Sequence, residues 1–463
     1  MLTYSFENIH GPIYEYLYER IKGDIIAGVL KPGEKLPSKR SFARQHGISI
    51  ITIQNAYDQL ISEGYILTEP RKGYFVAEIR NIHKIPVQGM VSYDIQIPQK
   101  PEYLYDLSNN AMNPEHFPFS VWASLSRSIL SDRKDELMTV SPSAGVLELR
   151  EAIANHLKSF RGMLVDPNQI IVGAGTEYLY GLLTKLLGTD AIYAIENPGY
   201  KKLKRIYEKL GATCKSTSID SNGITAEGLE RIGAQIAHIC PNHHFPTGIT
   251  MPASRRYELL AWANASADRY MIEDDYDSEF RLVGKPIPTL FSIDACEKVI
   301  YLNTFSKSLT PTIRISYMVL PVHLAKRFYE ELSFYSCTVS NFEQYILSEF
   351  ISKGYFEKHI NRMRLFYLRQ RKNVMELVEN SPLRKKCRIH ESESGLHFLL
   401  ELITEQPDAK IKEELNEAGI KLDALSDYFL LPSRAGEHLF IVNYSNINTN
   451  KFEEAIRRIA GVL

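Results

Sequence analysis

The chain has 463 residues, of which 44% are hydrophobic and 24% are charged, and its formal net charge is -1. This composition is typical of a folded soluble protein and excludes disordered, collagen-like and coiled-coil classes. The length predicts about two to four domains. Because the charge is nearly balanced, a nucleic-acid partner would have to be recognised by a local basic patch rather than by the whole protein.

Cysteine placement and the N-terminal residues indicate the cellular setting. The five cysteines are far apart and form no C-x-x-C pair, which favours reduced thiols over a disulfide framework or a zinc site. Residues 1–12 lack the basic and apolar regions of a signal peptide, and no run is apolar enough to cross a membrane. We therefore expect a cytoplasmic protein without a metal site or a membrane partner.

The first sixty-four residues predict three helices in succession. Apolar residues recur at three- and four-residue spacing between residues 12 and 28, as in an amphipathic helix. Ser38 suits the N-cap of a short helix that runs to Gln45. After a turn at Gly47, Ser49 is placed to cap a third helix that stops near residue 64.

A hairpin and a cluster of cations accompany these helices. The alternating segments 65–68 and 74–76 flank a basic turn at residues 69–73 and predict two short strands. Three helices followed by a hairpin predict a winged helix-turn-helix, whose third helix enters the major groove of DNA. Residues 31–54 carry a local net charge of +4, which could neutralise phosphates, although the charge alone would favour a solvated helical face.

These residues resemble the GntR-type DNA-binding domain over nearly all of residues 11–78. The likeness includes Leu36-Pro37-Ser38-Lys39-Arg40-Ser41-Phe42-Ala43, Gly47-Ile48-Ser49 and Arg71-Lys72-Gly73-Tyr74-Phe75-Val76. It implies an operator DNA partner contacted by Ser38, Arg40, Ser49, Thr52 and Gln54 from the helices and by Arg71, Lys72 and Gly73 from the wing. One departure is Ile50, where the family usually has an arginine that contacts guanine. Gln54 could read an adenine instead.

A linker follows, and after it the sequence predicts alternating strands and helices. From residue 77 to about 105 no period is sustained, and prolines and a glycine interrupt the segment, which predicts a domain boundary. Beyond it, apolar strands and helices alternate, which predicts an α/β fold with a mostly parallel sheet and helices on both faces. We expect a DNA-binding domain at 1–78, a linker at 79–105 and a large domain at 106–463.

Lys307 lies among hydroxyl side chains directly after the apolar segment 299–302. An amine held in such a place could lose its proton and attack an aldehyde. A surface lysine on a loop is an equal alternative when this stretch is considered alone.

Two further stretches suggest what Lys307 would act on. Residues 173–177, Gly-Ala-Gly-Thr-Glu, form a strand-to-helix turn whose backbone N–H groups could bind a phosphate, although small residues at such turns often serve packing alone. The strand from residue 270 ends in Glu273, Asp274, Asp275 and Tyr276. These carboxylates need a cationic partner, which a protonated pyridine nitrogen would supply. A metal site or a polar loop are the alternatives.

Taken in order with Pro198-Gly199-Tyr200, Pro246-Thr247-Gly248 and Arg314, these stretches make residues 106–463 resemble a fold-type I aminotransferase, with a smaller C-terminal α+β subdomain. The whole chain resembles the MocR-type branch of the GntR regulators. The resemblance implies pyridoxal 5'-phosphate as cofactor and a homodimer. It also implies specific roles: Lys307 as the Schiff-base lysine, Asp274 on the pyridine nitrogen, Tyr276 on the ring oxygen, Tyr200 stacked on the ring, and Gly175, Thr176, Ser306 and Arg314 on the phosphate.

Two departures from the aminotransferase pattern bear on function. The usual asparagine before Pro-Thr-Gly is Phe245 here, and Asn242, His243 or His244 could substitute for it. The usual arginine of the C-terminal strand is missing from residues 439–444, so that Arg434 is the expected effector-binding residue, with a solvated loop arginine as the alternative.

From these resemblances we predict a transcription regulator and not an enzyme. It would bind operator DNA and sense pyridoxal phosphate or an amino compound through an aldimine at Lys307. The alternative is a working aminotransferase with an incidental DNA-binding domain, and a slow half-reaction is compatible with either hypothesis.

Overall fold

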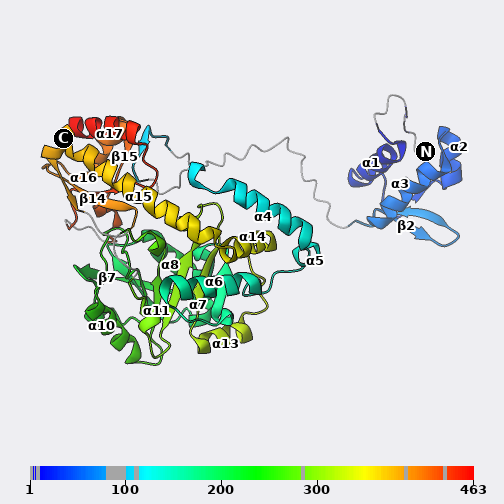
Figure 1. Ribbon diagram of the computed structural model, residues 1–463. Helices are drawn as coiled ribbons and strands as arrows, with labels where there is room; N and C mark the ends of the chain where they lie inside the picture. Colours follow the sequence, from blue (N-terminus) through cyan, green and yellow to red (C-terminus); the bar gives the residue numbers. More distant parts are fainter. Residues whose placement is uncertain are drawn as a thin grey trace. The chain divides into compact units, whose positions relative to one another are not determined.

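The computed structural model describes residues 4, 6, 11–79, 101–108, 114–282, 287–390, 395–430 and 435–463. The chain divides into two compact units, Met1–Lys100 and Pro101–Leu463, coloured from blue to red along the sequence in Figure 1. Residues 80–100 of the expected linker lie outside the described part, so the boundaries of that linker stay a prediction. Within the described residues, no helix is both long and apolar enough to span a membrane.

The N-terminal unit consists of three helices and a small antiparallel sheet in the order β1-β3-β2. The apolar faces of α1 and α3 meet, and Leu17, Ile21, Ile53, Tyr57 and Leu60 are fully buried between them and the sheet. The elements are α1 (Ile13–Ile26), β1 (Lys35–Leu36), α2 (Lys39–His46), α3 (Ile50–Ser62), β2 (Ile66–Glu69) and β3 (Gly73–Val76). The predicted three helices and hairpin are confirmed.

Capping side chains set where α2 and α3 begin. The hydroxyl of Ser38 accepts a hydrogen bond from the backbone N–H of Ser41, and that of Ser49 accepts one from the N–H of Thr52. Between the two helices Gly47 adopts φ +68°, a left-handed conformation that favours glycine. The two serine caps are therefore as predicted.

Strand β1 was not predicted, because its segment is rich in turn residues. Leu36 is nevertheless only 2% exposed, since it inserts into the core of the unit. Lys35 and Leu36 pair with Phe75 and Tyr74 of β3. The pairing adds a third strand to the hairpin.

The larger unit is built on an eight-stranded sheet in the order β5-β12-β11-β10-β9-β6-β7-β8. Its neighbours from β11 to β7 pair in parallel, whereas β12 and β8 run against their neighbours. The strands are β5 (Ile170–Gly173), β6 (Ile192–Asn197), β7 (Thr213–Asp220), β8 (Gly223–Ile224), β9 (Ile236–Ile239), β10 (Tyr270–Asp274), β11 (Val299–Thr304) and β12 (Ser316–Val319). The predicted mostly parallel sheet is confirmed.

Helices cover both faces of this sheet. In β5, Ile170 and Val172 pack into one buried cluster while Ile171 packs into another, as the period of two in a strand requires. One face is covered by α6 (Leu147–Arg161), α9 (Ala226–Ile232), α10 (Ala253–Asn264), α11 (Leu290–Ile293), α14 (Asn341–Ser352) and part of α15 (Tyr355–Glu379); the other by α7 (Thr176–Leu187), α8 (Lys201–Lys209) and α13 (Val322–Glu331). Three further helices are α4 (Phe119–Asp132), α5 (Lys134–Leu137) and α12 (Phe305–Ser308).

A smaller C-terminal subdomain contains an antiparallel sheet in the order β13-β14-β17-β16. In Figure 1 it lies at the upper left of the larger unit, with α16 and α17 beside it. Its elements are β13 (Cys387–His390), β14 (His397–Leu402), α16 (Asp408–Glu417), β15 (Ile420–Lys421), β16 (Asp423–Ala424), β17 (Leu439–Asn443) and α17 (Thr449–Val462). The strand at the start of the unit, β4 (Tyr105–Asp106), pairs in parallel with β15.

Candidate functional site

A cavity of about 340 Å³ lies where β6, β10 and β11 end. The C-terminal edge of parallel strands is where open α/β folds bind their ligands. Seven of the eight residues predicted to bind a cofactor line this one cavity: Thr176, Tyr200, Asp274, Tyr276, Ser306, Lys307 and Arg314. The structure therefore brings together side chains that are up to about 140 residues apart in the sequence.

The eighth predicted residue, Gly175, lies against the guanidinium group of Arg314. It is the N-cap of α7 and adopts φ +91°. A Cβ atom at this position would collide with Nη2 and Cζ of Arg314. The glycine thus lets the guanidinium approach the first turn of α7, where free backbone N–H groups and the helix dipole already favour an anion. Together they could form a cradle for a phosphate.

We predict that Gly175→Ala weakens the binding of pyridoxal phosphate by at least tenfold. The new methyl group would displace Arg314 from the helix end, and the left-handed backbone adds strain of about 1 kcal/mol. Titration of the cofactor-free protein, followed by the near-ultraviolet circular dichroism of the bound cofactor, measures the change.

Gly181 offers a matched control on the same helix. It has ordinary helical geometry, and a Cβ there would meet only Leu210, at 3.9 Å. Gly181→Ala should therefore leave the affinity unchanged and stabilise α7 slightly. Equal affinities for the two alanine variants would contradict the proposed phosphate cradle.

One carboxylate oxygen of Asp274 is hydrogen-bonded, and the other has no partner among the described residues. Its Oδ2 accepts a hydrogen bond of 2.9 Å from the hydroxyl of Tyr180 and lies 3.4 Å from Nε2 of His238. The other ring nitrogen of His238, Nδ1, lies 2.7 Å from the hydroxyl of Tyr207. Asp274 Oδ1 is buried and has no hydrogen-bond partner among the described residues. Such an oxygen is costly unless a donor reaches it, and a protonated pyridine nitrogen would be one.

Lys307 extends from α12, directly after β11, into the same cavity. Burial lowers the pKa of its amine, and the charge of Asp277 opposes this shift. A lowered pKa increases the share of uncharged, nucleophilic amine at neutral pH. Beside it, Oγ of Ser306 is buried and has no partner among the described residues. Both groups fit an aldehyde-bearing cofactor with a phosphate.

The three residues that could replace the usual asparagine have different surroundings. Asn242 donates a hydrogen bond of 2.7 Å to Oδ1 of Asp275, so its amide is engaged away from the cavity. His243 Nδ1 lies 2.8 Å from Oδ2 of Asp277 and 3.2 Å from the hydroxyl of Tyr276. His244 is the one of the three that lines the cavity. Burial, aided by His243, lowers the pKa of His244 to about 3, so its ring is neutral.

Three further lining residues are not indicated by the sequence pattern: Tyr180, His238 and Glu196. Tyr180 lies one helical turn after Thr176 on α7, and His238 is the polar member of an otherwise apolar strand. Either spacing could have signalled them. The carboxyl of Glu196 accepts a hydrogen bond of 2.9 Å from the backbone N–H of Cys240, and burial raises its pKa to about 8. It is therefore mostly neutral at pH 7.

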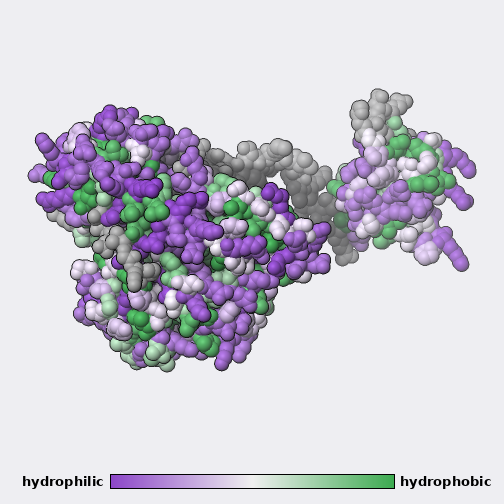
Figure 2. Space-filling view, in the orientation of Figure 1, coloured by the Kyte–Doolittle hydropathy of each residue, from purple (hydrophilic) through white to green (hydrophobic). Residues whose placement is uncertain are grey.

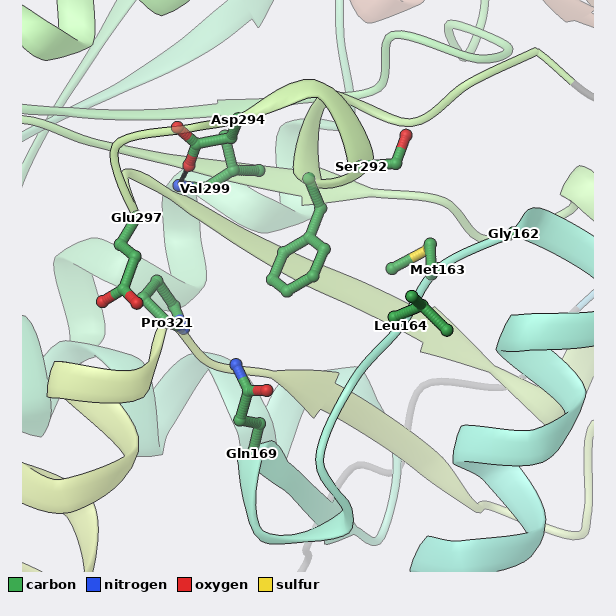
Figure 3. Close-up of a pocket in the computed structure, with 10 residues that line it drawn as sticks. Gly162, Met163, Leu164, Gln169, Ser292, Asp294, Glu297, Val299 and Pro321 are labelled. Carbon is green, nitrogen blue, oxygen red and sulfur yellow. Dashed lines mark hydrogen bonds between the residues drawn. The ribbon is translucent and has the colours of Figure 1, made fainter.

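A second cavity, of about 350 Å³, lies at the opposite edge of the sheet, where β5 and β11 begin (Figure 3). Its polar groups are already engaged. Asp294 Oδ2 accepts hydrogen bonds from the backbone N–H groups of residues 298 and 299, and Figure 3 draws the one from Val299 as a dashed line. The carboxylate of Glu297 pairs with the ring of His323 at 2.9 Å. Although it is about equally large, its described lining residues include none of the unpaired buried polar atoms found at the first cavity.

The predicted effector residue Arg434 lies outside the described residues. The described end of its loop is close to the first cavity, because the backbone N–H of Leu430 donates to Oδ1 of Asn197, at the end of β6. The assignment of Arg434 stays a prediction.

The predicted DNA-binding residues lie on two parts of the N-terminal unit. Ser38 and Arg40 belong to the start of α2, and Ser49, Thr52 and Gln54 to the start of α3. Arg71 and Lys72 lie in the turn between β2 and β3, and Gly73 is the first residue of β3. Arg40, Gln54, Arg71 and Lys72 are exposed, although the ammonium of Lys72 pairs with Glu69 at 2.9 Å and would exchange this partner for a phosphate.

Comparison with known proteins agrees with both units. Residues 13–76 match the family described as bacterial regulatory proteins, gntR family, and residues 104–459 match aminotransferase class I and II. The larger unit has the fold of a multiple substrate aminotransferase from Thermococcus profundus. The two superpose with a TM-score of 0.68 at 24% identity, over 79% of this chain and 92% of that one.

Relatives with both domains are similar over most of their length. HTH-type transcriptional regulator YdeL of Bacillus subtilis is 36% identical over 90% of this chain and 89% of its own. The pyridoxine biosynthesis transcriptional regulator PdxR of Corynebacterium glutamicum is 32% identical over 91% of this chain and 90% of its own. The probable rhizopine catabolism regulatory protein MocR of Rhizobium meliloti is 28% identical over 97% of this chain and 93% of its own. The chain belongs to the MocR-type GntR regulators, in which a winged helix-turn-helix is joined to a pyridoxal-phosphate-dependent, fold-type I aminotransferase domain.

Proposed function

We propose that this regulator binds operator DNA through its N-terminal unit and senses pyridoxal phosphate, or an amino compound that reacts with it, in the cavity around Lys307. The observation that carries the proposal is the unpaired Oδ1 of Asp274 in the same cavity as a lysine of lowered pKa. The names of PdxR and MocR, which refer to pyridoxine and rhizopine, support a role in vitamin or amine metabolism.

Each lining residue has a proposed task. Arg314, Thr176, Ser306 and the N-terminus of α7 next to Gly175 bind the phosphate. Asp274, fixed by Tyr180, holds the proton on the pyridine nitrogen, and Tyr276 and Tyr200 bind the ring oxygen and the ring face. When bound, pyridoxal phosphate supplies an aldehyde that combines with amines. Lys307 would hold that aldehyde in the cavity, where the amine of an effector would compete with it.

We infer a sensor rather than a metabolic catalyst because an expected substrate contact is missing. The described strand β17, where aminotransferases usually carry the arginine for the substrate carboxylate, contains no cationic side chain. Arg434 would supply this contact for an effector. Sustained multiple turnover of an amino donor with a 2-oxo acid would instead favour the aminotransferase hypothesis, whereas a slow single half-reaction is compatible with sensing.

We also propose that the protein is a homodimer. Helices α4, α5, α6 and α14 contact one another, and several large apolar side chains on or next to them face solvent. Figure 2 shows apolar surface in this region of the larger unit. Exposed apolar groups that gather in this way usually mark a protein interface. The residues are Phe119 (63% exposed), Leu130 (52%), Met138 (77%), Val140 (79%) and Phe342 (36%).

The regulatory proposal predicts that pyridoxal phosphate changes the affinity of the full-length protein for its own upstream DNA by at least about fivefold. Coupling between two sites typically lies between 1 and 3 kcal/mol, which corresponds to this change or a larger one. Fluorescence anisotropy of a labelled duplex, titrated with and without the cofactor, measures the difference. Absence of DNA binding in both states would refute the proposal.

A further inference from the structure

The first two residues of α3 are isoleucines that face solvent. Ile50 is 47% exposed and Ile51 is 71% exposed, although the next isoleucine of the helix, Ile53, is fully buried. Helical spacing places Ile51 on one edge with Gln54, Asn55 and Asp58, at intervals of three, four and seven residues. Each of these neighbours is also exposed.

The side chains of this edge can contact only some of the groups that bases present in the major groove. Helix α3 contains no lysine or arginine, so it offers no bidentate donor to the O6 and N7 atoms of guanine. It does offer the carboxamides of Gln54 and Asn55, which match the N6 and N7 atoms of adenine. Branched apolar side chains such as Ile50 and Ile51 match the methyl group that distinguishes thymine in the major groove. Both features favour A·T base pairs.

The polar groups nearest the two isoleucines are already engaged. Oγ of Ser49 accepts the backbone N–H of Thr52 at 3.1 Å and lies 2.9 Å from the Thr52 hydroxyl. These contacts stabilise the start of α3 and leave the two isoleucine side chains exposed beside it. A single exposed apolar residue is ordinary, but here two are adjacent on the first turn of the helix.

The charges around this edge suit DNA rather than a protein or lipid partner. Arg40 and Arg44 of α2, and Arg71 and Lys72 of the wing, are all exposed. Cations on both flanking elements can neutralise phosphates on either side of a groove, which would leave the uncharged first half of this edge, Ile51, Gln54 and Asn55, to contact the bases between them.

We propose that Ile50 and Ile51 recognise thymine methyl groups, so that each half-site of the operator contains A·T pairs where α3 enters the major groove. This inference rests on the proposed DNA-binding function and specifies its sequence preference. Removing one methyl group from a dry contact is expected to weaken binding about fourfold.

The test begins with duplexes that the full-length protein selects from a random-sequence library. In a selected duplex, each thymine is then replaced in turn by deoxyuridine, which lacks only the methyl group and keeps every hydrogen-bonding atom. At one or two thymines of each half-site we expect affinity to fall about fourfold, as measured by fluorescence anisotropy at constant salt. Replacement at the other thymines should change affinity less than twofold.

Protein variants identify the side chains involved. Ile50→Ala and Ile51→Ala should bind the thymine duplex more weakly and no longer distinguish it from its deoxyuridine counterpart. Ile26, which is 40% exposed near the end of α1, provides the matched control. Ile26→Ala should keep both the affinity and the discrimination of the natural protein.

Two results would overturn the inference while leaving DNA binding intact: no sensitivity to deoxyuridine at any thymine of a tightly bound duplex, or unchanged discrimination in both isoleucine variants. The first comparison uses the unmodified protein and so does not depend on how the variants fold. If the protein enriches no sequence from the library at all, the proposed operator binding itself fails.

Discussion

Lys307→Ala is expected to abolish the visible absorbance of protein loaded with pyridoxal phosphate. Lys307 is the amine that lines the cavity beside Asp274 and Tyr276, and burial lowers its pKa. Without it the cofactor has no covalent attachment and should be lost on dialysis. The absorbance spectrum before and after dialysis, together with the intact mass after hydride reduction, measures both effects.

A second lysine variant shows whether the loss of absorbance is specific to Lys307. Lys326→Ala removes an exposed lysine of α13 and should leave the visible band intact. Persistence of the band and of the added mass in Lys307→Ala would refute the assignment. In the same variant, the DNA affinity should no longer respond to the cofactor, whereas Lys326→Ala should respond as the natural protein does.

The lowered pKa of Lys307 also has a consequence for stability without cofactor. Below the ordinary lysine pKa of about 10.4, the unfolded chain binds this proton more readily than the folded protein does. The lysine therefore destabilises the cofactor-free fold at neutral pH, and the penalty disappears as the pH rises through that value. Lys307→Met should melt at an equal or higher temperature at pH 7, and the difference should shrink in alkaline buffer.

Asp274→Asn is expected to weaken the affinity for pyridoxal phosphate about a hundredfold. Loss of one partner of a buried charge pair costs about 3 kcal/mol or more, and each 1.4 kcal/mol corresponds to a factor of ten. The asparagine can still accept the hydrogen bond that Tyr180 donates to this position, so the cavity should keep its shape. Equilibrium titration of the cofactor-free protein gives the two dissociation constants.

Asp190→Asn is the matched control, because Asp190 is exposed in the turn before β6. It should leave the affinity unchanged. A change of less than threefold in Asp274→Asn would show that Oδ1 of Asp274 does not face a cationic ring nitrogen. The unpaired buried oxygen would then need another partner.

Local signals in the sequence were sufficient for the helices of the N-terminal unit. Ser38 and Ser49 are N-caps because their side-chain oxygens reach backbone N–H groups three residues away, an interaction that is encoded locally. Strand β1 was missed because it depends on pairing with β3, some forty residues later. The pairing of a two-residue strand leaves no period in its own sequence.

The residues of the cavity also divide into those with local sequence signals and those whose contacts depend on the folded sheet. Lys307, Asp274 and Arg314 could be predicted because each lies in a recognisable stretch next to a strand. The spacing of Tyr180 and the polarity of His238 were usable signals, but their contacts with Asp274 could not be predicted, since these cross from α7 and β9 to β10 and exist only when the sheet has formed. Only the folded protein could distinguish His244, which lines the cavity, from Asn242, which is bound to Asp275.

The pairing of β4 with β15 determines which part of the larger unit receives the chain from the DNA-binding domain. The N–H of Tyr105 donates to the carbonyl of Gly419 at 3.1 Å, and the N–H of Leu107 to that of Lys421 at 3.0 Å. The residues that follow the linker are thus anchored to the C-terminal subdomain rather than to the large sheet that carries Lys307. A shift of that subdomain would therefore carry residues 105–107 with it, without any change in the fold of the N-terminal unit.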